Sequence, residues 1–271
     1  MDLATFGRLV RGAEQEIDLG RTALAIAGIE HPRLAPERYL AALDGLARRS
    51  GLDGGAGRDA LERLCRFLFE EEGFRGNAAR YYDPRNSCLN DVLDRKLGIP
   101  ITLSVVLLEV GRRVGLTLSG VGLPGHFVVG AELAGGQVLV DPFNGGAVLS
   151  PEGAAAVVER ALGRRVELAQ QHFVACGKRQ ILIRMLRNLR TIYAKQGDWP
   201  KALAVVDRLL LLDAEAPIHR RDRGTVLVKL GRLAEGAADW QWYLTASPRA
   251  LDAEGFRREL RRVRQDLASL N

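Results

Sequence analysis

The stretch GIPITLSVVLLEVGRRVG, residues 98–115, combines a helix start with a long apolar face. Pro100 suits the first position of a helix, because the N–H group that proline lacks has no helical partner there. Apolar residues then recur at intervals of three and four positions, at Leu103, Val106, Leu107, Val110 and Val114. This spacing places them on one side of a helix. The stretch therefore predicts a buried central helix that begins at Pro100.

The residues after this helix are typical of short β-strands. LTLSGVGL (116–123), HFVVGAEL (126–133) and GQVLVDPF (136–143) are rich in β-forming residues, and Gly135-Gly136 is expected to form the hairpin turn between the second and the third. A helix thus leads into a small antiparallel sheet. His126 and Asp141 are expected on neighbouring strands of that sheet.

The chain before residue 79 reads as helical. LATFGRLV, DLGRTALAIAGI, PERYLAALDGLARR and RDALERLCRFLFEEE all show apolar residues at helical spacing. YYDPRNSCLNDVLDRKLG (81–98) then predicts a turn at Asp83-Pro84 and a further helix, which Asn86 or Ser87 could cap and which Gly98 would end.

The last third returns to helix and contains an internal repeat. Shifted by 34 positions, Gly197 falls on Gly231 and Val206 on Trp240. This period, with glycine at the turn between helices, resembles tetratricopeptide repeats. Two copies are fewer than a free-standing repeat array needs, so we expect them to lean on the rest of the chain or on a partner.

Composition limits the classes of function. The chain has 39 Lys and Arg against 33 Asp and Glu, and no run of apolar residues is long enough to cross a membrane, so we expect a cytoplasmic protein without a membrane partner. The arginine-rich run FRRELRRVRQDL (256–267) mixes in acidic residues and has no aromatic interleaving, so nucleic-acid binding is disfavoured. The cysteines Cys65, Cys88 and Cys176 and the four histidines are scattered, and we expect neither a metal site nor a cofactor.

A histidine and an aspartate on adjacent strands after a long helix resemble the transglutaminase-like, papain-related fold. In that family a cysteine at the helix start attacks an acyl carbon, the histidine is its base, and the aspartate orients the imidazole. The resemblance implies these last two roles for His126 and Asp141. The family's cysteine position falls on Pro100, which has no nucleophilic atom. A shifted register would offer Thr102 or Ser104, although both are common at helix starts for structural reasons.

Cys88 is the single cysteine of the transglutaminase-like segment and a second candidate nucleophile. It lies on the helix before Pro100, with Arg85 nearby, but a buried cysteine is more often a packing residue. Without a nucleophile, His126 and Asp141 are interpreted as a relic pair held by its own hydrogen bond.

Several motifs in order extend the resemblance over residues 15–250. YYDPRNSCLNDVLDRKLGIPITLSVVLLEVGRRVGL, GVGLPGHFVV, VDPFNGG, ILIRMLRNL and HRRDRG resemble a bacterial family that joins a transglutaminase-like domain to tetratricopeptide repeats, homologues of the Sir-B invasion regulator. Members of that family share the GIP start. The resemblance implies a fold, and it implies that Pro100 is a family trait.

We therefore expect an α+β protein in three parts: a helical N-terminal region (1–78), a transglutaminase-like core with a small antiparallel sheet (79–170) and tetratricopeptide-like helices (171–271). The predicted function is that of a pseudoenzyme, a non-catalytic scaffold or regulator of a protein or peptide partner, with Arg187 and Arg190 as candidate partner-binding residues. The alternative is an acyl transferase or amide hydrolase that uses Cys88 or a hydroxyl with His126 and Asp141.

Overall fold

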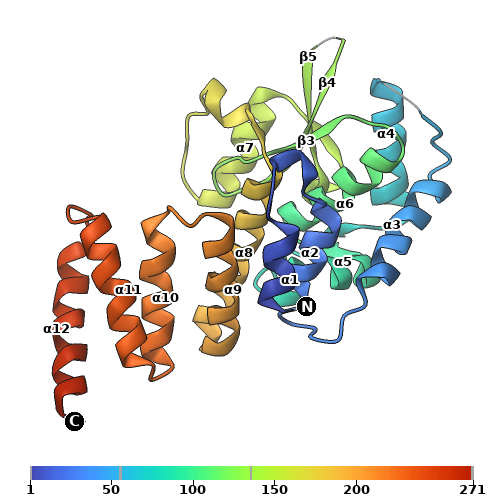
Figure 1. The fold of residues 1–271 in the computed structure, drawn as a ribbon. Coiled ribbons are helices and arrows are strands. Elements are labelled where there is room, and N and C mark those ends of the chain that lie inside the picture. Colours follow the sequence, from blue (N-terminus) through green and yellow to red (C-terminus); the bar gives the residue numbers. More distant parts are fainter. Residues whose placement is uncertain (1, 55–56, 135, 270–271) are drawn as a thin grey trace. The chain divides into compact units, whose positions relative to one another are not determined.

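The computed structural model describes residues 2–54, 57–134 and 136–269, which form two compact units. Residues 11–185 make up the first, called here the core unit, and residues 2–10 with 186–271 belong to the second, called here the repeat unit. Helices dominate both units, and the core unit also carries a small antiparallel sheet (Figure 1). The predicted α+β class is confirmed. Gly135, half of the predicted hairpin turn, lies outside the described residues.

Several helices of the core unit begin at residues that favour helix starts. The unit contains α2 (Leu19–Ala27), α3 (Pro36–Arg49), α4 (Arg58–Arg66), α5 (Leu89–Arg95), α6 (Pro100–Arg113) and α7 (Pro151–Leu162). Proline opens α3, α6 and α7, and the Asp18 carboxylate caps α2 by accepting from the N–H of Arg21 at 2.9 Å. Short 3-10 or π turns join them: η1 (Glu14–Glu16), η2 (Phe67–Glu71), η3 (Pro84–Ser87), η4 (Pro142–Asn144) and η5 (Gln170–Phe173).

Helix α6 is the centre of the core unit. Every residue from Pro100 to Gly111 is buried, so the helix is covered all round and not only on the face that the sequence predicted. It packs against α2, α3 and α5 and against two strands of the sheet. Such a helix holds its first turn, with Pro100, in a fixed place beside the strands.

The main sheet has five antiparallel strands in the order β6-β5-β4-β3-β7. The three predicted strands are present as β3 (Leu118–Val121), β4 (Val128–Leu133) and β5 (Gly136–Asp141), and β6 (Ala147–Leu149) and β7 (Ala175–Cys176) extend the edges. The register pairs Val129 with Val140, so the start of β4 lies beside the end of β5. The sheet therefore brings position 126 close to position 141.

The start and end of α5 differ from the prediction. Cys88 is the N-cap, because Asn86 and Ser87 are taken up in η3, where the Asn86 amide donates to the carbonyl oxygen of Arg80 at 2.7 Å. The helix ends before Gly98, since Lys96 adopts a left-handed conformation (φ 58°). Residues Leu97–Gly98 then form β2, which pairs with β1 (Arg75–Gly76) in a separate parallel ribbon.

The repeat unit consists of helices in antiparallel succession. It contains α1 (Leu3–Leu9), the end of α8 (Lys178–Gln196), α9 (Trp199–Leu212), α10 (Pro217–Lys229), α11 (Leu233–Ala246) and α12 (Ala253–Ser269). Gly197 and Gly231, matched by the repeat, are both left-handed (φ 71° and 76°) and precede α9 and α11. The internal repeat is thus a repeat of structure, with glycine where the backbone requires a positive φ.

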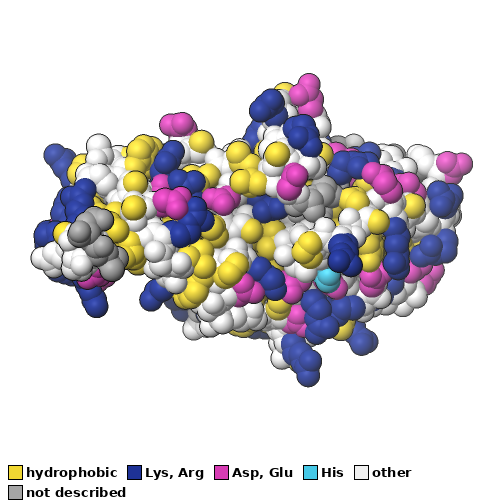
Figure 2. All heavy atoms as spheres, turned by 60° about the horizontal axis from the view of Figure 1, so that its bottom comes forward, with side chains coloured by type: hydrophobic (Ala, Val, Ile, Leu, Met, Phe, Trp, Pro, Cys, Tyr) yellow, Lys and Arg dark blue, Asp and Glu magenta, His cyan; other side chains and the backbone are white. Residues whose placement is uncertain are grey.

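Charged side chains of both signs lie side by side on the surface. Figure 2 shows Lys and Arg side chains spread over the visible face with Asp and Glu side chains among them. On α12, Arg257 is 3.1 Å from the Glu254 carboxylate. Among the described helices, none combines the length and the apolar character needed to span a bilayer.

Candidate functional site

His126 and Asp141 meet at one end of the sheet. His126 follows a turn with left-handed Gly125 (φ 70°) and leads into β4, while Asp141 is the last residue of β5. The imidazole Nε2 lies 2.9 Å from Asp141 Oδ2, and both side chains are buried. Because the antiparallel register fixes both strand ends, the backbone itself sets this contact.

The Asp141 carboxylate is saturated with donors. Its Oδ1 accepts from the N–H groups of Phe143 (3.0 Å) and Asn144 (3.3 Å), and its Oδ2 accepts from the Asn144 amide at 2.7 Å as well as facing His126. Burial alone would raise the pKa of Asp141, but the hydrogen bonds and charge of His126, together with Asn144, outweigh it and lower the pKa. The fold therefore favours a charged carboxylate beside the imidazole.

The main chain around the histidine is held from the other side by Arg184 on α8. Its Nη2 donates to the carbonyl oxygen of Leu123 at 2.9 Å and also to that of His126. The guanidinium lies 5.3 Å from the centre of the Phe127 ring. The sequence pointed to Arg184 only as one of several basic residues that could favour an acidic partner. It did not place Arg184 beside His126, since the bonded backbone groups are about 60 positions away and no motif marks them. Asn144 was also missed, although an asparagine shortly after Asp-Pro signals a capped turn.

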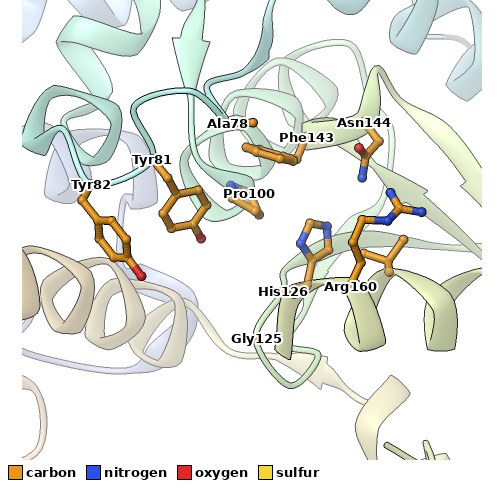
Figure 3. Close-up of a pocket in the computed structure, with 11 residues that line it drawn as sticks. Ala78, Tyr81, Tyr82, Pro100, Gly125, His126, Phe143, Asn144 and Arg160 are labelled. Carbon is orange, nitrogen blue, oxygen red and sulfur yellow. The ribbon is translucent and has the colours of Figure 1, made fainter. Parts of the chain in front are cut away.

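A cavity of about 390 Å³ opens beside His126 (Figure 3). Its wall is largely aromatic and apolar, with polar groups at a few places. Besides His126, the residues that line it are Ala78, Tyr81, Tyr82, Pro100, Gly125, Phe143, Asn144, Val157, Arg160 and Ala161. The rings of Tyr81 and His126 each stand edge-to-face with Phe143, at 6.1 Å between centroids. This size and lining are those of a small-ligand or side-chain pocket.

Pro100 faces this cavity together with His126, at the place where the family resemblance puts the attacking cysteine (Figure 3). Thr102 and Ser104 do not line it. The Thr102 hydroxyl donates to the carbonyl oxygen of Asn86 at 2.6 Å and accepts from the N–H of Ile99, and the Ser104 hydroxyl donates to the carbonyl oxygen of Pro100 at 2.8 Å. Both hydroxyls are buried and bound to the main chain at the helix start.

Cys88 lies in a different place from His126. It is fully buried, it is not part of the cavity wall, and its sulfur lies within 4.8 Å of ligand atoms of His31 and Asp91. His31 Nε2 in turn is 2.6 Å from Asp91 Oδ2. The structure thus brings Cys88 to a second histidine and aspartate, which the sequence did not place together.

The two arginines proposed for partner binding differ in their surroundings. Arg187 is exposed on α8. Arg190 is partly buried and paired with Asp222 of α10, and its pKa is lowered by burial and by the nearby charges of Arg187 and Arg221. The Arg190 guanidinium is therefore already neutralised by Asp222 inside the repeat unit.

Comparison with known proteins agrees with this architecture. Residues 37–187 match the transglutaminase-like superfamily, and residues 189–261 match the tetratricopeptide repeat. A UPF0162 protein of Xylella fastidiosa strain 9a5c is 37% identical over 241 residues, which cover 87% of this chain and 86% of that protein. The chain belongs to this bacterial family of transglutaminase-like proteins.

Other UPF0162 proteins align over similar lengths. One from Xylella fastidiosa strain Temecula1 is 36% identical over 259 residues, covering 91% of this chain and 90% of its own length. One from Vibrio cholerae is 27% identical over 246 residues, with 90% and 87% covered. The resemblance of the sequence to a transglutaminase-like protein with tetratricopeptide repeats is confirmed.

Proposed function

We propose that this protein is a non-catalytic scaffold or regulator, whose transglutaminase-like cavity binds a side chain or short segment of a protein partner. The observation that carries the proposal is Pro100, which faces the cavity beside His126. A pyrrolidine ring has no atom that can attack an acyl carbon, whereas it adds apolar surface to a wall already rich in aromatic rings.

The polar groups of the cavity suit recognition. Burial raises the pKa of Tyr81, so its phenol stays neutral near pH 7 and can donate a hydrogen bond. Asp141 engages Nε2 of His126, while Nδ1 of that ring has no hydrogen-bond partner among the described residues and remains open to a ligand. Arg160 adds one positive charge at the wall. These groups favour a segment with both an apolar and a carbonyl or carboxylate part.

Photo-crosslinking in bacterial cells tests the cavity. A photoreactive phenylalanine analogue replaces Tyr82, which is 59% exposed and lines the cavity. We expect one defined crosslinked protein. Ala161→Trp fills the cavity from the exposed side of α7 and should abolish the crosslink, whereas Ala156→Trp, exposed on the same helix but outside the cavity, should leave it unchanged. Equal yields from both tryptophan variants would refute binding in the cavity.

We further propose that the tetratricopeptide-like helices bind the partner through Arg187, because such repeats present extended surfaces to peptides. Arg187→Glu is the appropriate change, since charge reversal at Arg190 would set two carboxylates against each other at Asp222. We expect weaker co-purification of the crosslinked partner with Arg187→Glu and none of that loss with Arg261→Glu, an exposed arginine of α12. Unchanged co-purification would assign partner binding to the cavity alone.

The competing function is acyl transfer or amide hydrolysis with Cys88 or a hydroxyl as nucleophile. It requires Cys88 to respond to His126, although Cys88 lies beside His31 and Asp91. Treatment with a thiol-directed acyl electrophile at neutral pH, followed by mass spectrometry, measures labelling of each cysteine with and without His126→Ala. Selective Cys88 labelling that depends on His126 would favour the enzyme. Slow labelling that His126→Ala does not change agrees with the binding protein.

A further inference from the structure

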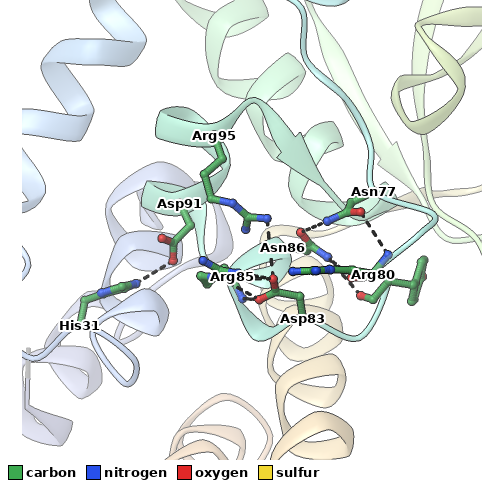
Figure 4. Close-up of polar contacts among 9 residues, drawn as sticks. His31, Asn77, Arg80, Asp83, Arg85, Asn86, Asp91 and Arg95 are labelled. Carbon is green, nitrogen blue, oxygen red and sulfur yellow. Dashed lines mark hydrogen bonds and ion pairs between the residues drawn. The ribbon is translucent and has the colours of Figure 1, made fainter.

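We propose that His31, Cys88 and Asp91 bind a divalent cation of the zinc class, independently of the function proposed above. His31 follows α2, whereas Cys88 caps α5 and Asp91 lies in its first turn. Figure 4 shows the His31 ring and the Asp91 carboxylate pointing toward each other from these separate segments. One nitrogen, one sulfur and one oxygen atom, all within 4.8 Å of one another, converge here.

The donor set matches the chemistry of zinc. Zn²⁺ takes imidazole nitrogen, thiolate sulfur and carboxylate oxygen, and three protein ligands with one further oxygen donor are a common arrangement. In a tetrahedral site with bonds of about 2.0–2.1 Å, nitrogen and oxygen ligands lie about 3.3 Å apart. The His31 and Asp91 atoms are now 2.6 Å apart, so they must separate by a fraction of an ångström. His31 is about one-third exposed, which leaves its ring room to do so.

A second observation at the same wall is a buried oxygen without a partner. Asn90 is 3% exposed, and its Oδ1 has no hydrogen-bond partner among the described residues. His31, Asn90 and Asp91 line one cavity of about 610 Å³, which gives an ion access from solvent. An amide oxygen left unpaired in a buried position is costly, and a nearby cation would offset that cost.

Binding releases one proton. The cation binds the Nε2 lone pair of the neutral His31 ring, whose proton is then on Nδ1, and the Asp91 carboxylate binds the cation directly. The Cys88 thiol loses its proton to solvent as the sulfur–metal bond forms. The cavity wall also carries Arg33 and Arg38, but Glu30 and Asp94 on the same wall balance them. The Asp91 carboxylate and the Cys88 thiolate therefore leave two negative charges in the ligand set, which favours a divalent cation over a monovalent one.

The sequence did not predict this group of three residues, because His31 lies far from the other two in the chain. His31 and Asp91 are separated by 60 positions, and no CxxC or HxxxH spacing marks them. Cys88 and Asp91 sit three positions apart on the first turn of α5, and only the packing of α2 against α5 adds the histidine.

Titration of the chelator-treated full chain with Zn²⁺ by calorimetry, and with Co²⁺ by absorption, tests the site. We expect one equivalent of Zn²⁺ and a thiolate-to-cobalt charge-transfer band. Cys88→Ser and His31→Gln should each weaken zinc binding by about 100-fold or more and remove or shift that band. Cys176→Ser and His172→Gln, which change a half-buried thiol and a half-buried imidazole of the same unit, should change neither.

His31→Gln decides the question if Cys88→Ser fails to fold, because the His31 side chain is partly exposed and its loss leaves the core packing intact. Absence of stoichiometric Zn²⁺ binding by the wild-type chain would overturn the proposal. So would binding that survives His31→Gln, or binding that depends equally on Cys176.

Discussion

Replacing Asp141 should loosen the end of the sheet that carries His126. Asp141→Ala removes an acceptor from two N–H groups, from the Asn144 amide and from the imidazole, all in a fully buried position. Buried donors left without an acceptor cost about 1–3 kcal/mol each, and breaking a buried pair costs about 3–5 kcal/mol in total. With a urea m-value of about 2 kcal/mol per M, the midpoint of core unfolding should fall by about 2 M.

Asp141→Asn is the matched variant. Asparagine caps a helical turn as well as aspartate does, so the contacts to Phe143 and Asn144 through Oδ1 are kept. The charge facing His126 is lost, and we expect a smaller cost, about 1–2 kcal/mol.

Two probes separate the units in this assay. All three tryptophans (Trp199, Trp240 and Trp242) lie in the repeat unit, so their fluorescence reports that unit. Pulsed thiol labelling of Cys65 and Cys88, both buried in the core unit, reports the other. Asp141→Ala should shift the labelling curve. Less than about 1 kcal/mol of destabilisation in that curve would refute the reasoning.

The stabilisation should also depend on pH. Since folding lowers the pKa of Asp141, its contribution is present above the unfolded value of about 3.9 and is lost as the pH falls through the lower folded value. The difference between the wild-type chain and Asp141→Asn should therefore shrink below about pH 4. A difference that stays constant from pH 7 to pH 3 would show that the charge of Asp141 contributes nothing.

Three further outcomes follow from two buried side chains and one close backbone contact. Burial lowers the pKa of His219, so the repeat unit should lose stability as the pH falls below the unfolded pKa of about 6.5. Urea unfolding followed by tryptophan fluorescence measures this pH dependence. His219→Gln should flatten it, and the control His172→Gln should not. A Cβ on Gly76 would lie 2.6 Å from a backbone oxygen of η4, so Gly76→Ala should lower the unfolding free energy of the core unit by about 1–3 kcal/mol in the thiol-labelling assay. A Cβ on Gly153 would meet no atom closer than 3.6 Å, so Gly153→Ala should leave this free energy unchanged. Burial raises the pKa of Cys65 to about 12, so at pH 8 this thiol should stay unlabelled until urea unfolds the core unit, and labelling of the native protein would contradict its burial.

The helix pattern and the three strands of the middle segment were predictable because local rules govern them. Pro100 opens α6, and the β-forming residues after Gly115 give β3, β4 and β5. The start of α5 was not predictable, because the Asn86 amide donates to the carbonyl oxygen of Arg80, six positions earlier, and does not cap the helix that follows. Two-residue β7 was also missed, since a pairing so short is decided by its neighbour β3 and not by its own residues.

The sequence by itself determined the α+β class, the repeat with its glycine turns, and the placement of His126 and Asp141 at neighbouring strands. Each of these depends on residue type or on a short, regular spacing. Only the tertiary structure decided that Pro100 shares a cavity with His126, that Arg184 holds the main chain of His126, and that Cys88 lies with His31 and Asp91 instead. Such contacts join residues tens of positions apart, and they exist only once α6, the sheet and the surrounding helices have packed.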